Sequence, residues 1–325
     1  MTDPVDREWL SPTRAWRLTE CAASVGPVTN APIALENNAL NAGTAAHRAI
    51  QVWINSNGYE DDDVRRRLSE AIDTVLKDSG GNVVVGEWTS TRARLLARAV
   101  QLAALLRRGG RVVSEKELRD SRHKLRGTPD IVVLGQGGAS VIDLKTPTTN
   151  CNSLPPWINF QLSIYAHLVR QEYGVLPRQT DVFRLNKGLI PAAISKSSVA
   201  VALETVQRAR EADRSVASPA PETCRYCRRR IECQPHWDAA TSWPETDCVE
   251  GTIERIERAE NGLTALHLQT SAGLQWVSGI PSVLVTAAVG ERLRLLRLKR
   301  SESVGDLNGF IWRPHSALGV VGASR

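Results

Sequence analysis

Two carboxylates and a lysine lie close together in RGTPDIVVLGQGGASVIDLKTP, residues 126–147. Asp130 follows a glycine-led turn, and Asp143 and Lys145 are expected on the next strand, after one hairpin. Side chains alternate along a strand, so Asp143 and Lys145 should share one face while Leu144 enters the core. Carboxylates from neighbouring strands can hold a hard divalent cation, which polarises a phosphate and lowers the pKa of a bound water. Lys145 would orient that water or neutralise the developing negative charge.

The spacing D-x(12)-D-x-K also fits an ordinary core strand with an ion pair. Apolar Val141 and Ile142 argue against a solvated strand face. Glu115 and Glu117, on the preceding strand, are two further candidates for a metal-site or orienting residue, and nothing local chooses between them. The chain has no G-x-x-x-x-G-K-[ST] loop, which predicts that it is not itself a P-loop ATPase.

Hydrophobic periodicity predicts the elements that position these residues and indicates an α/β fold. Helices are expected at 11–20, 42–56, 61–77, 89–108, 155–174 and 197–213. Strands are expected at 111–118, 124–134, 140–146, 181–188 and 191–197.

From about residue 248 the pattern changes to short strands separated by glycine turns, typical of a small all-β barrel of OB- or SH3-like type. We therefore predict two domains, 1–240 and 247–325, the second a nucleic-acid or protein-binding module. Alternation should place Arg292 and Arg294 on one strand face, which is either a solvated face or a nucleic-acid surface.

Cysteines form a second chemical signature. Cys224, Cys227 and Cys233 follow the spacing C-x2-C-x5-C, which indicates a metal or cluster site. His236 extends it as C-x2-H, so that these four residues could form a local zinc site. The remaining cysteines include Cys151 and Cys248, which suit the role of small buried hydrophobes.

The composition is that of a globular protein, and its charge is compatible with a polyanionic partner without establishing one. The chain has 325 residues and a net charge of +6, with a pI near 9.2. No apolar run approaches the roughly 20 residues that span a bilayer. The segment MTDPVDREWL does not look like a signal peptide, so we expect a cytoplasmic protein without a membrane partner.

Four motifs together resemble the PD-(D/E)xK nuclease superfamily of RecB type. GTPD followed by IDLKT resembles the nuclease core, GTAAHRAI resembles the segment with a helical histidine, and QLSIYA resembles the Q-x-x-x-Y motif. The resemblance spans roughly residues 8–238. It implies a restriction-endonuclease-like mixed sheet flanked by helices. The implied activity is a metal-dependent deoxyribonuclease, an exonuclease that hydrolyses phosphodiester bonds at single strands or ends.

The resemblance also implies which residues hold the metal. His47, Asp130 and Asp143 would bind Mg²⁺ or Mn²⁺, helped by the Leu144 carbonyl. Lys145 would serve the attacking water and the transition state. Many relatives have Glu where this chain has Asp143, and either carboxylate can ligate a metal.

Gln161 and Tyr165, four residues apart on one helix face, would contact DNA or order the active site. The implied partners are DNA and a helicase, recombination or defence protein in trans. The settings are repair and recombination, phage DNA processing and defence.

Within this superfamily, AddB-like and CRISPR-associated nucleases carry a [4Fe–4S] cluster, with one cysteine before the nuclease motifs and three after them. Cys21, Cys224, Cys227 and Cys233 match that pattern, and four thiolates are the usual ligands. The cluster would staple the domain, whereas the zinc alternative leaves Cys21 without a role. A different functional class, a non-catalytic DNA-binding subunit of a helicase–nuclease or CRISPR adaptation-type complex, is the alternative to the enzyme.

Overall fold

A computed structural model describes residues 9–29, 32–34, 41–80, 85–146, 153–301 and 308–322. Cys151 lies outside the described residues. The chain forms two compact units, Met1–Thr19 with Asn38–Glu211, and Glu20–Asn37 with Ala212–Arg325. The two-domain division at residues 240–247 stays a prediction. None of the described helices is long and apolar enough to cross a membrane.

The first unit is built on a five-stranded mixed sheet, in agreement with the predicted fold class. Its strands are β1 (Arg111–Ser114), β4 (Ile131–Gly135), β5 (Gly138–Lys145), β6 (Gln179–Arg184) and β7 (Gly188–Ala192), in the order β1-β4-β5-β6-β7. The pair β5 and β6 is parallel and the other three pairs are antiparallel. A parallel pair needs a crossover, which the helix between β5 and β6 supplies.

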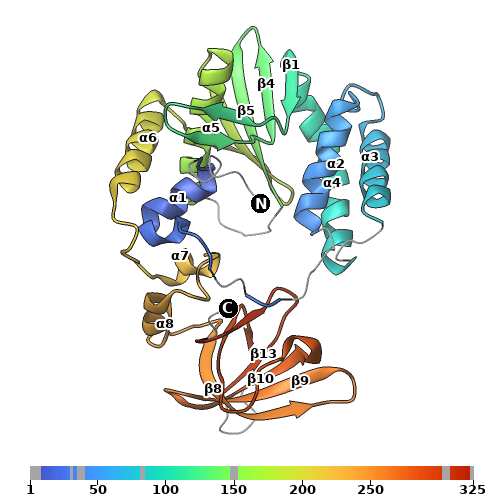
Figure 1. Ribbon diagram of the computed structural model, residues 1–325. Helices are drawn as coiled ribbons and strands as arrows, with labels where there is room; N and C mark the ends of the chain where they lie inside the picture. The colour runs from blue at the N-terminus through green and yellow to red at the C-terminus, as the bar shows by residue number, and fades with distance from the viewer. Residues whose placement is uncertain are drawn as a thin grey trace. The chain divides into compact units, whose positions relative to one another are not determined.

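Helices cover both faces of this sheet (Figure 1). They are α1 (Pro12–Glu20), α2 (Ala42–Asn55), α3 (Val64–Asp78), α4 (Val85–Leu106), α5 (Pro156–Tyr173) and α6 (Lys196–Glu211). Capping residues set the ends of three of them. The Asn41 side chain accepts from Thr44 N at the start of α2, Asp63 does the same for Arg66 N at α3, and Gly174 ends α5 with φ 74°.

The alternation predicted for β5 is present. Ile142 and Leu144 are buried in the core formed with α2, α3 and α4. Asp143 and Lys145 have the opposite orientation, toward Gln161 of α5. One strand thus supplies both the packing of the sheet and two polar groups of the site.

Two predicted strands are each divided in two. In the predicted strand 111–118, β1 ends at Ser114, and β2 (Leu118–Asp120) begins only at the last residue of that range. The predicted strand 124–134 divides into β3 (Leu125–Gly127) and β4. Pair β2–β3 forms its own two-stranded sheet. The chain leaves β1 at Glu115, whose φ of 51° lies in the left-handed region and ends the extended run.

Gly127 allows the β2–β3 hairpin to approach α5 closely. A β-carbon at this position would lie 2.9 Å from Cε1 of Tyr165 and 3.0 Å from Cδ1 of Leu168. Both neighbours are buried, so a larger residue would displace the hairpin that leads directly into Asp130.

The second unit contains a seven-stranded sheet, as the β-rich pattern predicted. Its strands are β8 (Val249–Arg258), β9 (Leu263–Thr270), β10 (Gly273–Pro281), β11 (Arg292–Leu296), β12 (Lys299–Arg300), β13 (Asn308–Ile311) and β14 (Ala317–Val320). Their order is β12-β13-β10-β9-β8-β11-β14. The OB or SH3 type stays a prediction. Short helices η2 (Ala22–Val25), α7 (Pro221–Arg225), α8 (Gln234–Ala240) and η3 (Ser282–Leu284) complete the unit.

The expectation that Arg294 lies on a solvated or nucleic-acid-binding strand face is wrong. Arg294 is buried: its Nε pairs with Glu250 at 2.9 Å and its Nη1 donates to the Ile231 carbonyl at 3.1 Å. Its guanidinium also lies over the Trp237 ring, 5.1 Å from the centroid. Arg294 therefore packs against the Cys-containing segment, while Arg292 remains exposed.

Candidate active site

His47, Asp130 and Glu115 meet at one end of the first unit's sheet. His47 Nδ1, on α2, lies 2.9 Å from Asp130 Oδ1 and 3.6 Å from Glu115 Oε1. Their ligand atoms all lie within 4.8 Å of one another, a spacing that one metal ion can bridge. These residues line a cavity of about 530 Å³, together with Arg48 and Gln51 among others, which gives a substrate access to the site.

The structure distinguishes the two glutamates that the sequence left as alternatives. Glu115 contacts His47, and its left-handed backbone conformation aims its carboxylate into the site. Glu117 is exposed and pairs with Arg119 at 2.6 Å. Glu115 is therefore the better candidate for an additional metal-site residue.

Asp143, Lys145, Gln161 and Tyr165 form a second connected group beside the first. Lys145 Nζ lies 2.7 Å from Asp143 Oδ2 and 3.4 Å from Gln161 Oε1. Gln161 Nε2 donates to Asp143 Oδ1 and to Tyr165 Oη, both at 3.2 Å. Gln161 thus uses both ends of its amide to orient the charged pair.

A backbone hydrogen bond joins the two groups. Leu144 N donates to Asp130 Oδ2 at 2.6 Å, while Asp130 Oδ1 faces His47. Asp130 is thereby fixed against β5, next to Asp143. The role of the Leu144 carbonyl as a metal ligand stays a prediction.

The crowded carboxylates of the site shift the pKa values of Asp143 and His47. Burial, together with the Asp130 charge, raises the pKa of Asp143 to about 6, although Lys145 acts in the opposite direction. Burial lowers the pKa of His47, but hydrogen bonds to Asp130 and Glu115 outweigh it and raise that pKa to about 10. A divalent ion would displace the His47 proton and favour ionised Asp143.

The donor set fits a divalent metal. Two to three carboxylates and one imidazole suit Mn²⁺ or Mg²⁺, and Lys145 supplies a fixed positive charge beside them. Such an ion would activate a water and polarise a phosphate. The arrangement has the side chains that metal-assisted hydrolysis of a phosphodiester requires.

The aromatic residue Trp157, at the start of α5, was not singled out from the sequence. Its ring lies 5.4 Å from Lys145 Nζ, and 40% of the residue is exposed. The pattern around PPWINFQ gave only a helix start, and the proximity of Trp157 to Lys145 depends on how α5 packs on β5.

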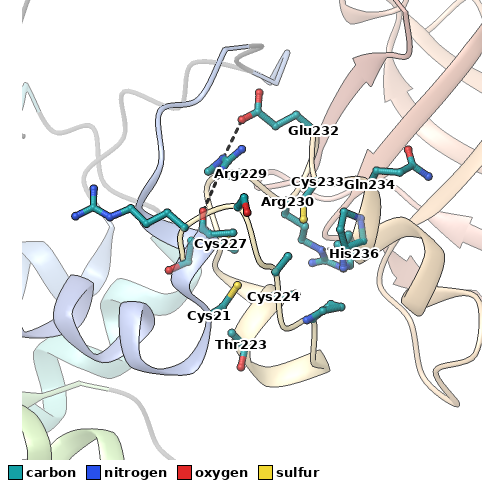
Figure 2. A pocket seen from close by; sticks show the side chains of 17 residues that line it. Cys21, Thr223, Cys224, Cys227, Arg229, Arg230, Glu232, Cys233, Gln234 and His236 are labelled. Carbon is teal, nitrogen blue, oxygen red and sulfur yellow. Dashed lines mark hydrogen bonds and ion pairs between the residues drawn. The ribbon is translucent and has the colours of Figure 1, made fainter. Parts of the chain in front are cut away.

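In the second unit, Cys21, Cys224, Cys227 and Cys233 line one cavity of about 270 Å³ (Figure 2). Three hydrogen-bonded turns carry the last three cysteines, with Cys227 N donating to Cys224 O and Arg230 N to Cys227 O. The fourth, Cys21, accepts a hydrogen bond at Sγ from a backbone N–H of the same unit. Burial raises the pKa of Cys224 to about 11, with a contribution from the neighbouring thiols.

Contacts between segments far apart in sequence hold Cys21 near the other cysteines. Arg229 Nη1 donates to Ala23 O at 2.8 Å, and the Thr29 hydroxyl donates to Glu232 at 2.6 Å. Figure 2 shows the ion pair between Arg229 and Glu232 that links these contacts. Side-chain contacts next to the thiols therefore hold together two segments that lie about two hundred residues apart in sequence.

His236 is fully buried and lines the same cavity as the four cysteines (Figure 2). Its Nε2 accepts from Arg230 Nε at 2.9 Å and lies 3.7 Å from Cys248 Sγ. Burial and the nearby Arg230 lower its pKa to about 3. Cys248 itself is buried beside Trp237 and Leu296, as predicted for a small hydrophobe.

Comparison with known families identifies the class of protein to which this fold and site belong. Residues 10–234 match the sequence model of the PD-(D/E)XK nuclease superfamily. The chain therefore belongs to that superfamily, which implies a divalent metal and a DNA substrate. Comparison with curated proteins gave no match.

Solved structures give only distant similarities. Tetrameric p202 HIN2 is 15% identical with a TM-score of 0.21, and the match covers 26% of this chain and 47% of that one. SSO0001 is 14% identical with a TM-score of 0.30, covering 63% and 89%. A murine DNA binding protein bound with ds DNA is 13% identical with a TM-score of 0.21, covering 65% and 94%. TM-scores this low carry no conclusion about fold or function.

Proposed function

We propose that this protein is a Mg²⁺- or Mn²⁺-dependent deoxyribonuclease that removes nucleotides from single strands or ends. The observation that carries the proposal is the chain of contacts from His47 to Asp130 and from Asp130 to the Leu144 N–H of β5, the strand that also carries the Asp143–Lys145 pair. A strand that merely carried an ion pair in a core would not need a histidine from a separate helix facing a cavity. This favours the catalytic interpretation over the structural one.

In this proposal the residues divide the chemistry between them. His47, Asp130 and Asp143 would hold the metal, with Glu115 as an additional ligand or orienting group. Lys145 would hold the attacking water or neutralise charge on the phosphate in the transition state. Gln161 and Tyr165 would keep the Asp143–Lys145 pair in register, as their hydrogen bonds indicate.

The position of Trp157 supports a single-stranded substrate. A half-exposed indole offers a face on which an unpaired base can stack. Since Trp157 lies beside Lys145, a base stacked there would place its own phosphate close to the metal site. A paired base inside a duplex has no free face for this contact.

A [4Fe–4S] cluster held by Cys21, Cys224, Cys227 and Cys233 is the second part of the proposal. The common cavity and the proximity of Cys21 support it. The same cavity is also lined by His236, the fourth ligand of the zinc alternative. Four thiolates are the usual ligands of a [4Fe–4S] cluster, and the cluster gives Cys21 a role that the zinc alternative does not.

The test is a cleavage assay on end-labelled single- and double-stranded DNA with Mn²⁺ or Mg²⁺. Wild type should shorten the single strand, and Asp143→Ala should not. The matched control is Glu117→Ala, which removes an exposed carboxylate near the site and should leave cleavage unchanged. The labelled end reports the polarity of cleavage. Fragments cut at internal positions would show that the enzyme is an endonuclease and not an exonuclease. No cleavage by folded, anaerobically purified wild type would instead favour a DNA-binding subunit.

A further inference from the structure

Asp120, His123 and His167 form a cluster that the nuclease mechanism does not use. Asp120 lies at the end of β2, His123 in the turn to β3, and His167 on α5. His123 Nδ1 and His167 Nε2 each lie 2.6 Å from the same atom, Asp120 Oδ2. Asp120 and His167 are buried, and the side chain of His123 is 27% exposed.

The geometry of this cluster is that of a ligand set. The two ring nitrogens and the carboxylate oxygen all lie within 4.8 Å of one another, a spacing that one metal ion can bridge. The imidazole rings are nearly perpendicular, at 86° with centroids 5.3 Å apart, and therefore do not block each other's nitrogens. The second carboxylate oxygen, Asp120 Oδ1, accepts from Arg122 N at 2.9 Å, which fixes the carboxylate in the way that metal ligands are commonly oriented.

The charge state of the cluster is also suitable. Burial would raise the pKa of Asp120, but the hydrogen bonds from His167 and His123 outweigh it and keep that pKa below its usual value. Asp120 is therefore an ionised carboxylate at neutral pH. The partial exposure of His123 leaves a route by which an ion and a water could reach the cluster.

We propose that Asp120, His123 and His167 bind a zinc ion at a site separate from the nuclease metal. Two imidazoles with one carboxylate suit Zn²⁺, whereas Mg²⁺ prefers oxygen ligands throughout. Three protein ligands leave the fourth tetrahedral position for a water. The site is distinct from the group His47, Glu115 and Asp130, with which it shares no residue.

The ion would act as a positioning element. It would join the β2–β3 hairpin to α5, through ligands that stand 44 and 47 residues apart from His167 in sequence. The hairpin continues into Asp130, and α5 carries Gln161 and Tyr165, so both sides of the active site depend on this junction. The hairpin and α5 are tightly packed at this junction, since Gly127 leaves no room for a β-carbon.

The experiment is elemental analysis of purified full-length protein after incubation with Zn²⁺ and removal of free metal. Wild type should carry one more zinc per chain than His167→Asn or His123→Asn. His315→Asn, which changes an exposed histidine of the second unit, is the matched control and should lose none. Because the comparison is a difference between variants, metal held by the cysteines cancels.

Two further readouts identify the ligands. The difference spectrum of Co²⁺-loaded wild type minus His123→Asn should show d–d bands without a sulfur-to-cobalt charge-transfer band. Added Zn²⁺ should raise Tm for wild type and less for either variant. His123→Asn serves if His167→Asn fails to fold, because His123 lies in a partly exposed turn.

Equal zinc content in wild type and His123→Asn, with equal Tm shifts, would overturn the proposal and leave a hydrogen-bonded network only. A sulfur charge-transfer band in the difference spectrum would also overturn it, by assigning the ion to the cysteines. None of these readouts depends on cleavage, so failure here is distinguishable from failure of the proposed nuclease.

Discussion

His47 Nδ1 lies 2.9 Å from Asp130 Oδ1, although 83 residues separate the two in sequence. The contact exists only when α2 packs on the sheet that carries Asp130. Since α2 also contributes a large apolar face to the core, burial of that face positions the histidine. Assembly of the active site is therefore tied to packing of the helical layer.

The first prediction concerns pH and metal binding. The raised pKa of His47 means that its imidazole is protonated near neutrality and must lose a proton to bind a metal. Mg²⁺ affinity should therefore increase about tenfold per pH unit between pH 7 and 9. Titration calorimetry in two buffers of different ionisation enthalpy should show a proton released on binding.

The same shift has a consequence for the metal-free protein. Because the folded-state pKa of His47 lies above its ordinary value of 6.5, the ion pair with Asp130 stabilises the fold fully below that pH. This contribution should disappear as the pH rises through about 10. His47→Asn should remove both pH dependences, and Mg²⁺ affinity that stays constant from pH 7 to 9 in wild type would contradict the assignment.

Lys145→Ala should lower the cleavage rate by roughly 10²–10³-fold, the usual loss for one group that stabilises transition-state charge. Its ammonium lies against Asp143 and not in a broad basic surface, so DNA affinity should change little. Single-turnover cleavage and fluorescence anisotropy measure the two effects separately. An equal loss of cleavage rate and of DNA affinity would show that Lys145 acts in DNA binding.

Gln161→Leu should reduce cleavage while DNA remains bound. The substitution leaves a buried Asp143 oxygen and the Tyr165 hydroxyl without the amide that joins them. Tyr165→Phe is the milder control because it keeps the Gln161–Asp143 contact. If Tyr165→Phe is as damaging as Gln161→Leu, the hydroxyl acts on the substrate itself.

Trp157→Ala should weaken binding of single-stranded DNA by about 5–150-fold, corresponding to the ~1–3 kcal/mol of one stacked base. Trp157→Phe should retain most of the affinity, and binding of a blunt duplex should change much less than that of a single strand. Anisotropy titrations at fixed salt measure this. An equal loss for both DNA forms would remove the argument for an unpaired base at this position.

Cys227→Ser should abolish the brown colour, the bound iron and the acid-labile sulfide of anaerobically purified protein. Cys248→Ala is the matched control, since Cys248 is a cysteine of the same unit outside the cavity set. Removal of the cluster should also lower Tm, because the bound cluster would cross-link Cys21 to the distant segment 224–233. A colourless wild type that contains stoichiometric zinc at its cysteines would establish the zinc alternative.

Local sequence determined much of this protein. The period of the apolar residues located all six major helices, and alternation along IDLK placed Asp143 and Lys145 on one face with Leu144 in the core. Short-range rules suffice for these features because strand and helix geometry repeat every few residues. The order of the motifs also indicated the family that the later comparison established.

Tertiary structure assigned different roles to residues that the local sequence pattern does not distinguish. Glu115 and Glu117 stand on the same predicted strand, and only the left-handed turn at Glu115 directs it to His47. Strand alternation predicted a surface position for Arg294, whereas in the structure it is buried and bonds to Glu250 and the Ile231 carbonyl. His123 and His167 belong to no motif, since they meet only where the β2–β3 hairpin packs on α5. These choices depend on contacts between distant segments, which spacing along one strand or helix does not encode.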